Sequence, residues 1–167
     1  TLTNFPFRFR LTGCTDISSN AHSGGKDFIF TFQDGLTRTH CERDGYLWGS
    51  GSYFIRASSL SESHDTDFYL YYGNPSEDAT DDPGYLPTGV WEPSYQAVWH
   101  LQEPWPTMED STTNGYELTG SYYIRYQDPG LSDKAVMLIT TLRTNLIRKG
   151  DEFNFKNLTV EAWVKTK

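Results

Sequence analysis

The chain has 167 residues, which is long enough for one large all-β domain or two small ones. Its formal net charge of -8 repels nucleic-acid phosphates and anionic lipid head groups, so we expect no nucleic-acid partner. No apolar run of about eighteen residues is present, and Thr1 opens no basic and apolar leader; we expect no membrane insertion, and no signal peptide is visible. Aromatic residues make up 16% of the chain, which favours strands over helices.

The first elements show strict alternation. Residues 5–11 place Phe5, Phe7, Phe9 and Leu11 on one face, with Pro6, Arg8 and Arg10 on the other. Residues 27–32 repeat the pattern with Phe28, Phe30 and Phe32, and Gln33-Asp-Gly35 is typical of a turn. We therefore predict two strands, each with one face in a core.

Further short strands follow at regular spacing. We expect them at residues 36–42, 46–48, 53–56 and 68–72. Asp44-Gly45 predicts a turn, and Gly49-Ser-Gly-Ser52 predicts a flexible one. This spacing is typical of a β-sandwich.

The second half of the chain follows an acidic stretch rich in proline and glycine, residues 77–94, which we interpret as a linker or a long surface loop. A strand with Tyr95, Ala97, Trp99 and Leu101 on one face opens the next unit, and an amphipathic strand at 158–165 closes it. Residues 134–147 have apolar residues at helical spacing, but their β-branched residues also suit a pair of strands.

No catalytic motif is present. Gly49-Ser-Gly-Ser52 lacks the order of a nucleophile elbow, and the four histidines have no metal-ligand spacing. A carboxylate pair for glycoside cleavage could be drawn from the acids at 92, 103, 109 and 110, but solvated surface is the simpler interpretation. We therefore expect a protein that is not an enzyme.

Two kinds of ligand site are candidates. Asp110 and Asn114 lie in a tight polar turn whose oxygens suit calcium, although the same residues also suit an Asx turn. A sugar platform needs exposed aromatic rings, because C–H groups of a pyranose stack on them. The aromatic candidates lie in loop-like surroundings, with core packing as the alternative role for each: Tyr85, Trp91, Trp105 and Tyr116.

Two covalent features are also candidates. Cys14 and Cys41 lie at the ends of expected neighbouring strands, so they could form a disulfide worth roughly 3–4 kcal/mol, or stay as two buried free thiols. Asn157-Leu-Thr159 is a sequon for N-glycosylation.

Residues 24–35, 53–58 and 65–75, which end in Tyr71-Tyr-Gly-Asn-Pro75, resemble an extracellular domain of unknown function with a Y-Y-G-N-P signature. That family domain often precedes a concanavalin A-like or laminin G-like jelly roll. Four later segments are similar to the opening half of such a jelly roll: 98–103, 110–115, 134–138 and 158–165. The resemblance implies strands over 134–147.

The expected architecture is all-β, with a β-sandwich of immunoglobulin-like or jelly-roll-like type at 1–76, a linker at 77–94, and a partial concanavalin A-like jelly roll at 95–167. The resemblance implies an extracellular, secreted or surface-displayed protein. We expect a non-catalytic carbohydrate-binding or adhesion module whose partner is a glycan or a cell-surface or matrix protein. The alternative is a structural subunit of a filament, appendage or viral fibre, completed by strands from a neighbouring chain, because the sequence stops directly after a predicted central strand.

Overall fold

The computed structural model describes residues 1–74, 76, 86–91, 93–104, 106–129, 134–148 and 156–166. The chain divides into two compact units. Unit 1 comprises Thr1–Val98 and Asp110–Gly115, and unit 2 comprises Trp99–Glu109 and Tyr116–Lys167. Antiparallel strands are the main regular structure among the described residues of both units, with almost no helix, so the all-β prediction is confirmed. The border falls at residues 98 and 99, and the chain returns once to unit 1, a division that differs from the predicted linker at 77–94.

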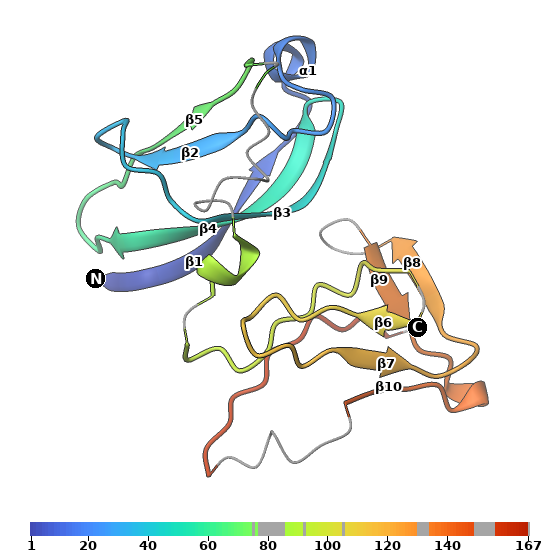
Figure 1. The fold of residues 1–167 in the computed structure, drawn as a ribbon. Coiled ribbons are helices and arrows are strands. Elements are labelled where there is room, and N and C mark those ends of the chain that lie inside the picture. Colours follow the sequence, from blue (N-terminus) through green and yellow to red (C-terminus); the bar gives the residue numbers. More distant parts are fainter. Residues whose placement is uncertain are drawn as a thin grey trace. The chain divides into compact units, whose positions relative to one another are not determined.

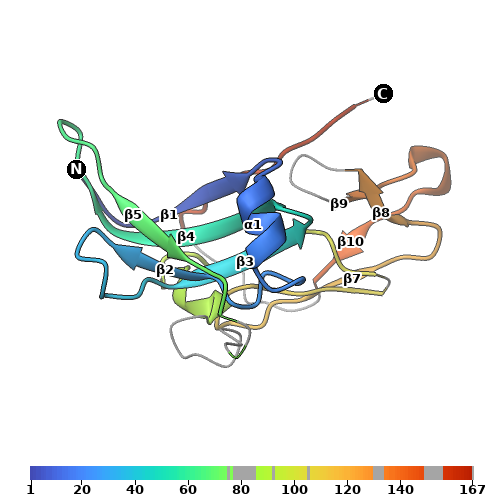
Figure 2. The same cartoon turned by 90° about the horizontal axis from the view of Figure 1, so that it is seen from above.

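Unit 1 contains two antiparallel sheets, and Figure 1 shows one lying over the other. The larger sheet has the order β1 (Leu2–Leu11), β4 (Ser50–Leu60), β3 (Cys41–Leu47). The smaller sheet pairs β2 (Ile29–Phe32) with β5 (Phe68–Tyr71). Figure 2 shows the same two layers from above, with the short helix α1 (Thr15–Asn20) at one end.

One apolar core joins the two sheets. Register in the larger sheet places Phe7 opposite Ile55 and Phe9 opposite Tyr53, so their side chains share a face. Tyr53 and Ile55 have no exposed surface, and Phe9 meets Phe30 of β2 edge to face at 5.4 Å between ring centroids. The alternation predicted for residues 5–11 and 27–32 is confirmed for Phe7, Phe9, Phe28 and Phe30, which lie in or against this core, whereas Phe5 is exposed.

The region from β3 to β4 corrects two turn predictions. Asp44-Gly45 is not a turn; it lies inside β3, where the register shifts between Arg43 and Gly45 as in a β-bulge. Ser50 to Ser52 belong to β4, so the turn consists of Trp48 and Gly49 alone. Both turn residues have positive φ, 50° and 72°, which is the conformation of a type I′ hairpin.

A segment of the predicted linker also belongs to the fold of unit 1. The 3₁₀ turn η3 (Pro87–Gly89) precedes Val90, which is fully buried. The Arg56 guanidinium donates to the Gly89 carbonyl at 3.0 Å, and the Trp91 ring meets Phe54 at 5.4 Å. Phe54 and Arg56 point away from the core, so this segment covers the outer face of the larger sheet.

Unit 2 is built from short strands. The described strands are β6 (Thr107–Met108), β7 (Leu118–Gly120), β8 (Arg125–Pro129), β9 (Lys134–Met137) and β10 (Leu146–Ile147). They form a sheet of order β10, β7, β6 and a separate pair of β8 with β9. Met108 and Ile124 are the buried apolar side chains in the described part of this unit.

Three sequence predictions for the second half need correction or refinement. Residues 95–101 form no strand, because Val98 and Gln96 bond to the side chains of Asp110 and Asn114 rather than to a ladder. Residues 158–165 form no strand either. The helical spacing at 134–147 is misleading: β9, the 3₁₀ turn η4 (Thr140–Leu142) and β10 occupy that segment, as the resemblance implied.

Candidate ligand-binding surface

Trp91, a predicted platform residue, is part of a packed cluster in unit 1. Its indole Nε1 donates to Glu42 Oε2 at 2.7 Å, and its ring meets Tyr95 edge to face at 5.4 Å. Glu42 is 7% exposed, and its other oxygen accepts from Ser111 Oγ at 2.6 Å. Trp91 therefore links the covering segment to β3, which is the packing role considered for it.

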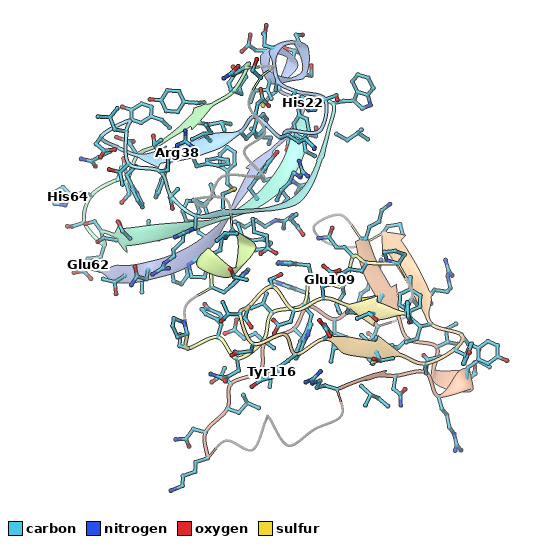
Figure 3. All side chains as sticks on the ribbon, viewed as in Figure 1. His22, Arg38, Glu62, His64, Glu109 and Tyr116 are labelled. Carbon is cyan, nitrogen blue, oxygen red and sulfur yellow. The ribbon has the colours of Figure 1, made fainter. Side chains whose placement is uncertain are left out.

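Tyr116 is engaged in unit 2. The Arg148 guanidinium lies over its ring at 5.4 Å from the centroid, and its carbonyl accepts from Trp99 Nε1 at 2.7 Å. Figure 3 labels Tyr116 among these packed side chains. Trp91 and Tyr116 belong to different units, so neither unit gathers the predicted platform. Tyr85 and Trp105 lie outside the described residues.

The candidate calcium ligands form the Asx turn considered as the alternative. Asp110 Oδ1 accepts from the amides of Val98 and Thr112, and Oδ2 accepts from Thr112 Oγ1 at 2.8 Å. Asn114 Nδ2 donates to the Gln96 carbonyl at 3.0 Å. These bonds leave calcium binding at Asp110 and Asn114 a prediction. Within the described ranges no group of three or more His, Cys, Asp or Glu side chains could hold a metal ion.

No disulfide joins Cys14 and Cys41 in the structure, so the predicted bridge is not formed. Cys14 bonds to Gly49 through the backbone, whereas Cys41 lies opposite Ile55. Six residues of extended chain separate these two points of attachment, which is about 20 Å. A disulfide needs Cα atoms within about 7 Å. Asn157 of the predicted sequon is exposed, and its glycosylation stays a prediction.

A pair of tyrosines that sequence reasoning did not select forms a better candidate. Tyr69 and Tyr71 of β5 are 49% and 48% exposed, because they alternate with Phe68 and Leu70, which face the core. Residues two apart on a strand share a face and lie about 7 Å apart. The Tyr71 hydroxyl donates to the Gly35 carbonyl at 3.0 Å, which fixes the direction of its ring.

Arg38 extends this surface. Thr31 of β2 lies opposite Tyr69 and also opposite Arg38 in an isolated antiparallel bridge. Directly opposite residues share a face, so the three side chains form one row, with Tyr69 and Arg38 about 10 Å apart. Thr31 is buried between its neighbours, and Arg38 is exposed. Figure 3 shows Arg38 at this sheet. We call Tyr69, Tyr71, Thr31 and Arg38 the tyrosine face.

The end of β5 is held in place by a buried carboxylate. Asp27 is 2% exposed, and its two oxygens accept from the amides of Gly73, at 2.6 Å, and His22, at 3.0 Å. Gly73 has φ of 91°, a conformation that side chains disfavour. The bond between Asp27 and Gly73 connects the first and the last of the three segments that carry the Y-Y-G-N-P resemblance. The neighbouring Tyr72 hydroxyl donates to Asp16, and this hydrogen bond raises the pKa of Tyr72.

Comparisons with known proteins give no match: no family model, curated protein or solved structure is similar to this chain. The resemblance to the Y-Y-G-N-P domain and to a jelly roll therefore stays a prediction. The structure itself suggests how Tyr69 and Tyr71 could have been found in the sequence. Residues 68–71 alternate Phe, Tyr, Leu, Tyr, and the more polar rings are the outward ones.

Proposed function

We propose that this chain is a non-catalytic, extracellular carbohydrate-binding or adhesion module, in which unit 1 is a β-sandwich and unit 2 belongs to a concanavalin A-like jelly roll. One observation carries the proposal: two tyrosine rings, each about half exposed, share one face of a strand in the tyrosine face. A sugar presents C–H groups to such rings and hydroxyls to polar neighbours.

The surroundings of the two tyrosines support this function. Both rings stand on a paired strand with Phe68 and Leu70 in the core, so little side-chain order has to be gained on binding. Arg38 is exposed and places a polar, charged side chain at the far end of the row. A glycan or a glycosylated cell-surface or matrix protein is therefore the proposed partner.

A glycan array, read with and without calcium, tests the proposal. We expect binding to at least one glycan, and we expect Tyr69→Ala and Tyr71→Ala each to weaken it about tenfold or more, since each removes one stacking surface. Binding that requires calcium would point to Asp110 and Asn114 as well, whereas binding without calcium would rest on the tyrosine face alone. A blank array under both conditions would contradict the function.

A matched control comes from a second exposed tyrosine pair. Tyr122 and Tyr123 are 76% and 72% exposed and lie in unit 2. Replacing both with alanine removes two phenols without touching β5. If this double variant abolishes glycan binding while Tyr69→Ala and Tyr71→Ala keep it, the function holds and the tyrosine face is the wrong site.

A second candidate function is an assembly subunit that is completed by strands from a neighbouring chain. The observation that favours it is the segment 158–166, which has every side chain exposed and no strand partner among the described residues. Such a segment is suited to strand addition. Sedimentation over a range of protein concentrations tests it. The sedimenting mass of an assembly subunit should rise with concentration. A mass that stays that of the monomer at every concentration would contradict this function.

A further inference from the structure

Residues 158–166 expose an amphipathic strand pattern to water. Alternate positions carry Leu158, Val160, Ala162 and Val164, and the side chains of Val160 and Val164 are 79% and 80% exposed. The other positions carry Thr159, Glu161, Trp163 and Lys165, and Trp163 is 90% exposed. A two-faced strand of this kind gains by pairing, because pairing covers its backbone groups and its apolar face.

The sequence of this segment is complementary to itself in an antiparallel register centred on Trp163. Apolar residues oppose apolar residues only when the two residue numbers of each pair add to an even sum, because side chains alternate along a strand. Centring the pair on Glu161 places that carboxylate opposite its own copy, which is unfavourable. Centring it on Ala162 places Glu161 opposite Trp163 and leaves both charges without an opposite partner.

Centring the pair on Trp163 matches the charges on one face and pairs apolar residues at the middle of the other, where only Val160 meets a polar residue, Thr166. Glu161 then lies opposite Lys165 twice, once on each side of two opposed Trp163 rings. Ala162 lies opposite Val164 twice on the other face. Opposite charges and aromatic pairs are the cross-strand pairs that stabilise antiparallel sheets. A parallel arrangement in register brings like charges together instead.

We propose that residues 160–166 pair with the same segment of a second copy of this chain, antiparallel and centred on Trp163. The proposal rests on the second candidate function, that of an assembly subunit, and names its partner and register. Such an interface is isologous, because each copy contributes the same residues to both halves. It joins two copies and closes, so a filament would require a further, different contact.

The strength of this contact is limited by its size. A pair of short strands is marginally stable in water by itself, and a small interface of this kind is typical of weak association. We therefore expect a dimer that dissociates on dilution, with a dissociation constant of about 10⁻⁶ M or higher. High salt should weaken it further, since both charge pairs are at the surface.

Charge reversal and its rescue test the register by sedimentation equilibrium of the full chain. Glu161→Lys turns both opposed pairs into pairs of like charge, so we expect dimerisation to weaken about tenfold or more. Lys165→Glu should have a similar effect. The double variant Glu161→Lys with Lys165→Glu restores both pairs and the net charge, and we expect it to dimerise as the wild type does.

Glu117→Lys is the matched control, because Glu117 is exposed in unit 2 and its reversal changes the net charge equally. It should leave dimerisation unchanged. A wild-type chain that remains monomeric at every concentration overturns both the subunit function and this pairing. A dimer that is indifferent to Glu161→Lys, or that the double variant fails to restore, overturns the pairing alone and leaves the subunit function standing.

Discussion

Glu42 shows how one carboxylate organises the outer face of unit 1. It accepts from Trp91 Nε1 and from Ser111 Oγ, two donors from different parts of the chain, while its own backbone pairs in β3. The role of Glu42 cannot be predicted from local sequence, because the two donors lie 49 and 69 positions away. A buried carboxylate with two donors is costly to replace, since removing it leaves both donors without their acceptor.

Glu42→Ala should therefore lower the free energy of unfolding by roughly 2–4 kcal/mol, measured by denaturant unfolding. Glu42→Gln keeps one acceptor oxygen and should cost about half as much. Glu62→Gln is the control, because its side chain is 82% exposed and its contact with the amino terminus is 3.5 Å long, so we expect less than about 0.5 kcal/mol. Equal free energies of unfolding for Glu42→Ala and Glu62→Gln would show that the two hydrogen bonds to Glu42 do not stabilise the fold.

Asp34 makes the loop between β2 and β3 sensitive to acid. Its carboxylate accepts from the Thr37 hydroxyl and from the amides of Leu36 and Thr37. The hydrogen bond from the Thr37 side chain, followed by those from the two amides, lowers the pKa of Asp34 below the usual value of an aspartate. Because the folded pKa is depressed, this loop is stabilised above the usual pKa and loses that stabilisation as pH falls through the folded pKa.

Carboxyl NMR titration can check this directly. Replacing Thr37 with alanine should move the pKa of Asp34 up toward the usual value of an aspartate, whereas Thr37→Ser keeps a hydroxyl and should preserve the low pKa. If the pKa of Asp34 were the same in Thr37→Ala and in the wild type, the hydrogen bond from the Thr37 hydroxyl would not be the cause of the low pKa.

At the level of elements, the hairpin between β3 and β4 carries backbone strain. Trp48 has φ of 50° and is 78% exposed, in a turn where both residues need positive φ. Glycine is the right residue at position 49, because a Cβ there would collide with the Cys14 carbonyl oxygen. Tryptophan is unfavourable at position 48, since a left-handed conformation costs a bulky residue roughly 1–2 kcal/mol.

Trp48→Asn should thus raise the free energy of unfolding by roughly 1 kcal/mol, because Asn-Gly is the preferred pair for this turn. Tyr122→Asn serves as the control, since Tyr122 is similarly exposed at 76% and is not among the described residues with positive φ. The free energy of unfolding is measured by chemical denaturation. A value for Trp48→Asn no higher than that of the wild type would show that Trp48 carries no such strain.

The elements also show what the sequence can and cannot predict. Period-two alternation predicts the core residues of β1 and β2 because a sheet buries every second side chain. Helix α1 escapes prediction, since Ser and Asn are poor helix formers; Ile17 is buried, and Ser18 and Ser19 bond back to the Thr15 carbonyl. Residues 95–101 alternate equally well, yet side chains from Asp110 and Asn114 replace the ladder.

The candidate site was predictable only in part, for a related reason. Rings in loop-like surroundings were expected to be open, but the covering segment packs Trp91 against Phe54 and Glu42. Tyr69 and Tyr71 are open because the opposite face of their strand fills the core. Which face of a strand another segment will cover depends on contacts between residues far apart in the chain.

For the whole molecule, the two units differ in how much core they contain. In unit 1, Phe28, Tyr53 and Ile55 have no exposed surface and lie in one cluster drawn from both sheets. In the described part of unit 2, Met108 and Ile124 are the buried apolar side chains, and β6 and β10 have two residues each. Since buried apolar surface supplies most of the stability of a fold, unit 1 should be the more stable unit.

Native-state hydrogen exchange followed by mass spectrometry measures this difference. Amides of β4 should be the most protected, because β4 pairs on both sides and carries core residues along its length. Amides of β7 should exchange at least about a hundredfold faster than those of β4. The reason is that opening unit 2 should require less free energy than opening unit 1, by roughly 3 kcal/mol or more. Glu42→Ala should bring the exchange of β4 closer to that of β7, because it weakens unit 1 alone. Equal protection of β4 and β7 in the wild type would mean that the two units unfold together as one cooperative body, despite their unequal cores.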